Sequence, residues 1–478
     1  MSCNHHHHAK QHAFTGFNAR EREGLTLVSR RGMMKAGFAG LAGLTLPGLL
    51  EARATSRAAS GKSLILLWMA GGPSHLDTLD PKPDRPLENR GPFGVISTKL
   101  PGVVICEHLP KMAAMLDKFT IIRSVDCRFS NHEPNKVMQT ANLDAEPRIN
   151  RESELYPCFG SVVAKHHGAN HPSMPPYVAF QTSRTHVGYA GYLGKQYDPF
   201  LANQATRLPL LTNVGADTGR LSDAQLFNSP VGLSHERVHN RRRLLEDMDR
   251  LRRDLDASMQ SMNVYQQRAF DLVLGRRAQE AFDISREPEK SRDRFGKQLW
   301  SQQALIARRL VEAGAAFVTL DLSYHPASGT WDTHGDNIPP YGGISKGLKP
   351  LLPLFDHLFT TLVGDLGERG LLDDTLVIAM GEFGRTPRMG TQDSTDGRDH
   401  WPVVMSMSIA GGGFRHGQVI GSTTDDGGYL NERPVTPGDL AATIYHHFGI
   451  PLDATYTDHS GRVRFLVTQG EPIRELVG

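Results

Sequence analysis

The sequence is poor in cysteine, with four in 478 residues and none in a C-x-x-C pair. Cys3 lies near the N-terminus, which leaves Cys106, Cys127 and Cys158 for the body of the chain. Three cysteines cannot all pair, so a disulfide framework is not expected, although a single bridge remains open. The sequence also has no P-loop, no G-x-G-x-x-G after an expected strand and no G-x-S-x-G elbow. It therefore gives no support to a nucleotide-binding site or a serine hydrolase.

Long runs of one charge sign are absent too, and 53 basic residues nearly balance 51 acidic ones. Such a balance gives no electrostatic footprint for nucleic acid, which is not expected as a partner. No apolar stretch reaches the roughly 20 residues of a membrane helix. The mature protein is therefore expected to have no stable membrane span.

The N-terminal region contains an export signal. Arg30 and Arg31 precede an uncharged, glycine-rich run at 36–50, which has the length of a signal-peptide core. Residues 52–54 (Ala-Arg-Ala) supply a small-x-small cleavage pattern, and 58–60 supply a second. We predict a twin-arginine signal peptide over residues 1–54 and a mature domain over 55–478, exported to the periplasm or the cell exterior. The alternative is an N-terminal anchor that stays attached.

Short apolar segments rich in branched residues alternate with helical stretches along the mature chain. This alternation predicts an α/β fold with a mainly parallel central sheet and helices on both faces. The expected strands are 63–69, 120–125, 316–322, 375–380 and 403–409, and the expected helices include 304–313, 351–366 and 437–448.

Two other segments differ in pattern. In 234–283, apolar residues recur every three or four positions between dense charges, which predicts a helical excursion packed on the sheet. A coiled-coil surface for a partner is the alternative, but the apolar stripe is short for one. The stretch 177–231 contains several prolines and glycines and is expected to be irregular and to cover the site.

Chemically useful side chains flank the expected strands. In chain order they are His75 and Asp77, His132, Asp332 and His334, Glu382 and Arg385, and His400. Because the carboxyl ends of parallel strands meet at one edge of a sheet, these groups are expected on that edge. Imidazoles with carboxylates suit Zn²⁺ or Mn²⁺, whereas carboxylates alone favour Mg²⁺ or Ca²⁺. The expected cofactor is therefore a divalent metal ion: Zn, Mn, Ca or Mg.

Arg385 follows the fourth expected strand within Gly-Glu-Phe-Gly-Arg-Thr-Pro. A guanidinium at such a position is able to clamp an anionic group with two parallel hydrogen bonds. A buried ion pair with Glu382 is an equally good interpretation.

Six segments carry a family resemblance. They are 29–31 (SRR), 67–78 (LWMAGGPSHLDT), 331–334 (WDTH), 380–387 (MGEFGRTP), 397–402 (GRDHWP) and 434–440 (PVTPGDL). Together they resemble bacterial proteins of the domain-of-unknown-function family 1501, from the signal to the C-terminus. Those proteins are often labelled sulfatase-like and look like members of the alkaline phosphatase/sulfatase superfamily. The resemblance thus implies an alkaline phosphatase-like sandwich.

The order of metal ligands in that superfamily implies site positions in this chain. His75 or Asp77 would stand near the first ligand position, Asp332 and His334 fit a middle pair, and His400 fits the last ligand.

The chain also departs from the superfamily pattern. Glu382 stands where the aspartate of an Asp-His pair belongs, and Phe383, which cannot bind metal, stands in the place of the histidine. Glu382 would then be a further ligand or would orient one. The sulfatase nucleophile motif Cys-x-Pro-x-Arg and the alkaline phosphatase nucleophile motif are both absent. The resemblance therefore implies a single metal site more readily than a two-metal mechanism.

These features predict an exported metal-dependent hydrolase. A metal held by Asp332, His334 and His400 would activate water, and His75 or His132 would be the general acid or base. The expected partner is an anionic ester, either a sulfated glycan or a phosphoester. The alternative is a non-catalytic binding or scaffold protein on a degenerate fold of this type.

Overall fold

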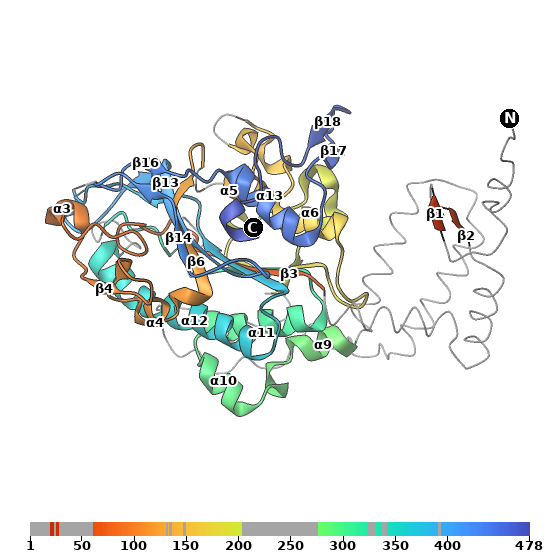
Figure 1. Ribbon diagram of the computed structural model, residues 1–478, viewed down its shortest axis with the longest axis horizontal. Coiled ribbons are helices and arrows are strands. Elements are labelled where there is room, and N and C mark those ends of the chain that lie inside the picture. Colours follow the sequence, from red (N-terminus) through yellow and green to blue (C-terminus); the bar gives the residue numbers. More distant parts are fainter. Residues whose placement is uncertain are drawn as a thin grey trace, which may run out of the picture. The chain divides into compact units, whose positions relative to one another are not determined.

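The computed structural model describes two compact units, residues 1–60 and 61–478 (Figure 1). In the first unit it describes only two short strands, β1 (Arg20–Arg22) and β2 (Leu25–Leu27), which pair antiparallel. The rest of the predicted signal peptide lies outside the described residues. In the second unit the described residues are 61–130, 132, 136–146, 150–202, 276–323, 330–335, 342–390 and 393–478.

The second unit is built on an eight-stranded sheet in the order β14-β6-β13-β10-β3-β9-β7-β8. Neighbouring strands run parallel except where β13 pairs with β6 and β10. The strands are β3 (Ser63–Trp68), β6 (Phe119–Asp126), β7 (Tyr177–Phe180), β8 (Phe200–Leu201), β9 (Phe317–Asp321), β10 (Thr375–Met380), β13 (Val404–Gly411) and β14 (Gln418–Ile420). This mainly parallel sheet confirms the fold class expected from the sequence.

Helices lie on both sides of the sheet (Figure 1). One side carries α4 (Pro110–Ala114), α9 (Arg276–Phe282), α10 (Glu289–Phe295), α11 (Leu299–Ala313) and α12 (Lys349–Glu368), and the other carries α5 (Lys136–Thr140), α6 (Phe159–His166) and α13 (Pro437–Phe448). Side chains of β3 alternate between the two cores, as the twofold period of a strand requires: Ile65 and Leu67 pack on the first side, Leu64 and Leu66 on the second.

The expected strands and helices are confirmed to within a few residues. Helix α13 matches its expected range of 437–448 because its sequence signals are strong: Thr436 and Asp439 form a reciprocal capping box, Pro437 opens the first turn, and Gly449 ends the helix in the left-handed conformation. The expectation of irregular structure from residue 177 is wrong at its start, where Tyr177–Phe180 is the fully buried strand β7. Residues 203–231 lie outside the described chain.

The reversed direction of β13 matters for the site. Because β13 runs against its neighbours, its first residues lie at the edge where the parallel strands end. The short strand β12 (His400–Trp401) stands just before it and pairs with β11 (Gly384–Arg385), so that Arg385 lies opposite His400. A residue that precedes β13 therefore meets residues that follow β6, β9 and β10.

The remaining described elements are small. They are α3 (Leu87–Arg90), α14 (Arg474–Val477), and the antiparallel pairs β4 (Val95–Ser97) with β5 (Val104–Cys106), β15 (Ser422–Thr423) with β16 (Leu430–Glu432), and β17 (Thr455–Thr457) with β18 (Val463–Phe465). Of the predicted helical excursion at 234–283, only 276–283 is described, and most of it forms α9. The described cysteines Cys106, Cys127 and Cys158 are buried, and none of the three forms a disulfide bond. None of the described helices is long and apolar enough to cross a membrane.

Candidate metal centre

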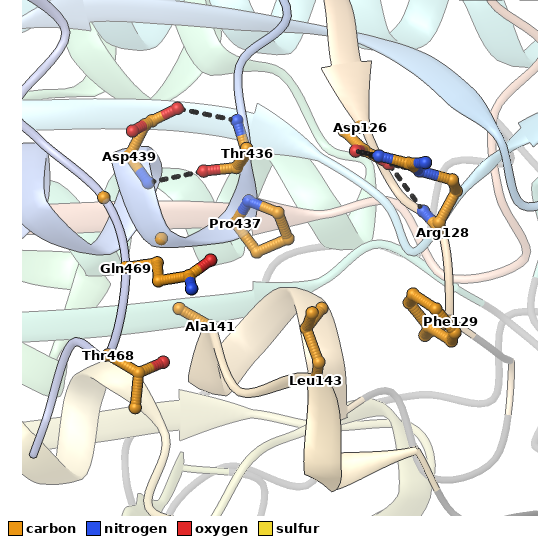
Figure 2. A pocket seen from close by; sticks show the side chains of 12 residues that line it. Asp126, Arg128, Phe129, Ala141, Leu143, Thr436, Pro437, Asp439, Thr468 and Gln469 are labelled. Carbon is orange, nitrogen blue, oxygen red and sulfur yellow. Dashed lines mark hydrogen bonds and ion pairs between the residues drawn. The ribbon is translucent and has the colours of Figure 1, made fainter.

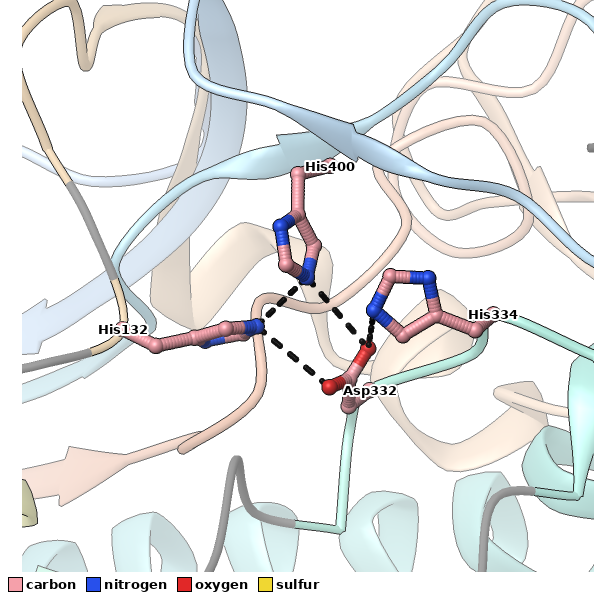
Figure 3. Close-up of side chains that lie close together, drawn as sticks. All are labelled: His132, Asp332, His334 and His400. Atoms are coloured by element: carbon pink, nitrogen blue, oxygen red, sulfur yellow. Dashed lines mark hydrogen bonds and ion pairs between the residues drawn. The ribbon is translucent and has the colours of Figure 1, made fainter. Parts of the chain in front are cut away.

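Four side chains converge at the edge where the parallel strands end: His132, Asp332, His334 and His400. One nitrogen or oxygen from each lies within 4.8 Å of the others. Figure 3 shows the rings of His132, His334 and His400 reaching in from three directions, with the Asp332 carboxylate beneath them. Three imidazoles and one carboxylate are a donor set typical of Zn²⁺, Mn²⁺ or Fe²⁺ sites.

The distances within this cluster are short. The Nε2 atom of His132 lies 2.6 Å from Nε2 of His400 and 3.3 Å from Oδ2 of Asp332. Oδ1 of Asp332 lies 3.1 Å from Nε2 of His334 and 3.7 Å from Nε2 of His400. The expectation that Asp332, His334 and His400 converge on one point is thus met by the geometry.

Asp332 is held in place by the chain just before it. The indole of Trp331 is fully buried and donates to the Leu322 carbonyl at 3.0 Å. The backbone N–H of Trp331 donates to the Ala70 carbonyl, also at 3.0 Å. Gly71 has φ of +115°, and any side chain there would collide with the backbone of Trp331 and Asp332. The glycine turn after β3 therefore lets the two loops approach backbone to backbone.

Glu382 orients His132. Its Oε1 atom accepts a hydrogen bond from Nδ1 of His132 at 2.7 Å and another from the Gly71 backbone N–H at 2.8 Å. Since Nδ1 faces the carboxylate, Nε2 of His132 is the nitrogen that points into the cluster. Oδ1 of Asp399 lies 3.3 Å from Nδ1 of His334. Carboxylates behind histidines fix the ring and raise its basicity in metal sites.

Arg385 forms a buried ion pair, and its partner is Asp332. Its guanidinium lies 2.5 Å from Oδ1 of Asp332, with both side chains fully buried. It also donates to the carbonyls of Gly71, Gly72 and Arg398. The prediction that Arg385 pairs with Glu382 is wrong. An anion clamp is not supported either, because the guanidinium is fully buried and donates four hydrogen bonds within the protein.

The pKa values in the cluster follow from burial and charge. Burial alone would raise the pKa of Asp332, but the Arg385 charge and the His132 and His400 imidazoles hold it well below its ordinary value. Burial lowers the pKa of His334 to about 4 and also lowers that of His400. Burial opposes the charging of His132 as well, yet hydrogen bonds with Asp332 and Glu382 raise its pKa overall. The cluster thus contains an ionised carboxylate and two histidines that stay neutral near pH 7.

The chain's own polar atoms support a cation at this point. Oε2 of Glu382 is buried and makes no hydrogen bond to the described residues, and Oδ2 of Asp332 is buried with Nε2 of His132 at 3.3 Å but without a well-aligned donor among those residues. Leaving buried carboxylate oxygens without a donor is costly. Asp332, Glu382 and Asp399 at −1 each and Arg385 at +1 sum to −2, a charge that a divalent ion would offset. The residues therefore fit a divalent metal ion.

Comparison with known proteins gives a family for this fold and site. The model of the family described as "Protein of unknown function (DUF1501)" matches residues 61–477. The chain belongs to the DUF1501 family. The resemblance read from the five sequence segments within residues 61–477 is thereby confirmed, and the segment 29–31 lies outside the match. No curated protein matches the sequence of this DUF1501 chain.

Several solved structures are distantly similar to this DUF1501 protein. Ps i-CgsB in complex with k-i-k-neocarrahexaose has a TM-score of 0.38 at 10% identity, covering 82% of this chain and 72% of its own. The sulfatase PsFucS1 from Pseudoalteromonas sp. has 0.38 at 13%, covering 84% and 71%. The phosphonate monoester hydrolase SpPMH from Silicibacter pomeroyi has 0.33 at 12%, covering 87% and 76%. Likenesses this distant say nothing about the substrate.

Two residues proposed from the DUF1501 sequence are placed outside the cluster. Asp77 pairs with Arg398 at 2.7 Å and accepts from Ser74 at 2.5 Å, with the Asp77 and Arg398 side chains fully buried. His75 is 1% exposed and its Nε2 lies 2.8 Å from the Gly427 carbonyl. The side chains of Asp77 and His75 thus hold neighbouring loops together, and neither residue belongs to the four-residue cluster. The glycine-rich loop serves the site through the backbone of Gly71 and Gly72 instead.

His132 was expected to handle protons, and the structure places it in the cluster with Asp332, His334 and His400. Its sequence context, Ser-Asn-His-Glu after β6, gives no spacing signal that separates a ligand from a proton donor. The sequence feature that points to His132 is Glu382 followed by Phe383. Because no histidine stands next to Glu382 in the sequence, this carboxylate is available to bind a histidine from another loop. Phe383 fills that neighbouring position, with its ring 4.8 Å from that of His132 and 4.9 Å from that of His400.

Proposed function

We propose that this protein is an exported, metal-dependent hydrolase of sulfate or phosphate esters. The observation that carries the proposal is the convergence of His132, Asp332, His334 and His400 within 4.8 Å at the sheet edge. The site is open to one side, since the His400 side chain is 29% exposed while Asp332 is fully buried. Four protein donors would leave a position for water on a five- or six-coordinate ion such as Mn²⁺, whereas they would close a tetrahedral Zn²⁺ site.

The chain's residues prepare the site. Arg385 and the two glycine carbonyls it contacts hold the Asp332 carboxylate in one orientation, and Glu382 keeps the proton of His132 on Nδ1. A divalent metal bound by the cluster would polarise an ester oxygen and lower the pKa of water to roughly 7. The positive charge of the metal itself would attract an anionic ester.

Water is the nucleophile that best fits the described residues. Burial raises the pKa of Cys127 well above its ordinary value, so this thiol does not supply a thiolate. The Ser124 hydroxyl donates to the Arg433 carbonyl at 2.5 Å, and Ser74 donates to Asp77. The Asp77 carboxylate that faces Ser74 is paired with the buried Arg398, and the partner of Ser124 is a backbone carbonyl, which does not take up its proton.

Export through the twin-arginine pathway belongs to the same proposal. It is supported by the Arg30-Arg31 pair, the uncharged run and the small-residue cleavage pattern. Export of a folded chain would allow the metal to be loaded before the protein leaves the cytoplasm.

The test is hydrolysis by metal-loaded protein. Aryl sulfates, phosphate monoesters and phosphodiesters are assayed with Mn²⁺, Zn²⁺, Ca²⁺ or Mg²⁺, using wild type and His400→Ala. His416→Ala is a matched control, because His416 is a partly buried histidine bonded to Thr120 and Gly411, outside the cluster. The proposal expects turnover that is lost in His400→Ala and kept in His416→Ala. Metal binding without turnover of any ester would favour the binding-protein alternative, and equal turnover in both variants would refute the site.

A further inference from the structure

A cavity of about 310 Å³ lies beside the carboxyl end of β6, outside the metal cluster. Its wall contains Phe129 and Leu143 on one side and Thr468 and Gln469 on the other, with Pro437 of α13 between them (Figure 2). The volume is at the small end of the range for ligand pockets, roughly 300–1,000 Å³.

The floor of this cavity is rigid. Gly438 in the first turn of α13 and Gly470 lie backbone against backbone, and a side chain on either would collide with the other segment. Asp439 is fully engaged in the same turn, accepting from the backbone N–H of Thr436 at 2.9 Å and of Glu471 at 3.0 Å. The cavity is thus preformed, as small-molecule sites usually are.

Two wall residues adopt a backbone conformation that stability alone disfavours. Phe129 has φ of 69° and Ala141 has φ of 56°, and neither is a glycine. The left-handed region costs such residues roughly 1 kcal/mol. Phe129 is 53% exposed on the rim, and Leu143 is 52% exposed. Strained residues that present an aromatic ring to solvent are typical of binding sites.

The polar groups of the wall are suited to hydroxyls. Arg128 is 63% exposed and is held flat by Asp126, with N–O distances of 2.5 to 3.0 Å. Within the described chain, the Thr468 hydroxyl and the Gln469 amide make no side-chain hydrogen bond, so both remain available to a ligand. Asp126 and Asp439 at −1 each and Arg128 at +1 give the wall a charge of −1, which disfavours an anion.

We propose that this cavity binds an uncharged sugar ring. One apolar face of the ring would lie on Phe129, and its hydroxyls would bond to Gln469, Thr468 and the free N–H groups of Arg128. Phe129 and the metal-cluster residue His132 lie on the same segment after β6, only three positions apart. The further statement that the sugar is part of the ester substrate rests on the proposed function; the binding itself does not.

The test is binding of neutral methyl glycosides of galactose, glucose, fucose and xylose, measured by saturation-transfer NMR and calorimetry with chelator present. Phe129→Gly removes the ring and relieves the backbone strain, so the variant should fold at least as well as wild type. We expect its Kd to rise about tenfold, as loss of an aromatic contact implies. Phe465→Gly is the control, because Phe465 is also 53% exposed but lies on β18.

Each outcome decides the matter. Binding that is weakened in Phe129→Gly and in Gln469→Ala but kept in Phe465→Gly supports the proposal. Absence of binding for every glycoside, or equal binding in all variants, overturns it. Preference for a 6-sulfated methyl galactoside that depends on Arg128 would also overturn it, since the ligand would then be anionic. Because no ester is hydrolysed and no metal is present, failure of the hydrolase proposal leaves this result unaffected.

Discussion

Removing the charge of Arg385 should destabilise the protein, because this side chain is an internal counter-ion rather than a substrate clamp. In Arg385→Met, the Asp332 carboxylate stays buried without its 2.5 Å partner, and the carbonyls of Gly71 and Gly72 lose a donor. Breaking one side of a buried ion pair costs about 3–5 kcal/mol. We expect a loss of that size in the free energy of unfolding of metal-free protein. Urea unfolding followed by tryptophan fluorescence measures it.

The control is Arg276→Met. Arg276 also pairs with a carboxylate, at 2.9 Å from Glu280, but its side chain is 86% exposed. Exposed pairs contribute about 0–1 kcal/mol, so this variant should unfold almost like wild type. The double variant Asp332→Asn with Arg385→Met should lose less than the sum of the two single changes. A loss in Arg385→Met no larger than that of the control would refute the ion-pair role and reopen the anion clamp.

Three further changes have defined outcomes. Burial lowers the pKa of His447 to about 4, so as pH falls the unfolded chain takes up this proton before the folded protein does. Between pH 7.5 and pH 5 this histidine should therefore lower the free energy of unfolding by about 2 kcal/mol. The urea midpoint of His447→Gln should fall less over that range than the midpoint of wild type. Glu382→Gln should weaken Zn²⁺ or Mn²⁺ affinity about 10- to 100-fold by releasing His132; an unchanged value in chelator competition would rule out the orienting role. Replacement of Arg30 and Arg31 by Lys should retain the precursor in the cytoplasm, and normal export in cell fractionation would exclude the twin-arginine signal.

Much of the fold is predictable because its signals are local. The run 375–380 is apolar and rich in branched residues, and it forms β10 over the same range. The capping box at Thr436 and Asp439 sets the start of α13. By contrast, the four-residue strand β7 lies among prolines and glycines, and it is a strand because it pairs with β9, far along the chain. Short strands that depend on distant partners leave little trace in the local sequence.

The location of the site could be predicted from the sequence, but the partner of each side chain could not. Asp332, His334 and His400 converge because strand ends share an edge, which topology alone dictates. The partners of Asp77 and Arg385 were not predictable. Whether a carboxylate faces a metal or an arginine depends on loop packing between segments about 320 residues apart, as with Asp77 and Arg398. Sequence pattern does not encode that choice.

The metal content of the purified protein tests the central claim most directly. Wild type and His400→Ala are incubated with Zn²⁺ or Mn²⁺, freed of loose ions by gel filtration and analysed by mass spectrometry, with His416→Ala as the control. The account predicts about one ion per chain in wild type and in the control, and a small fraction of that in His400→Ala, because loss of one ligand opens the site. Wild type without metal, or His400→Ala with as much metal as wild type, would contradict it.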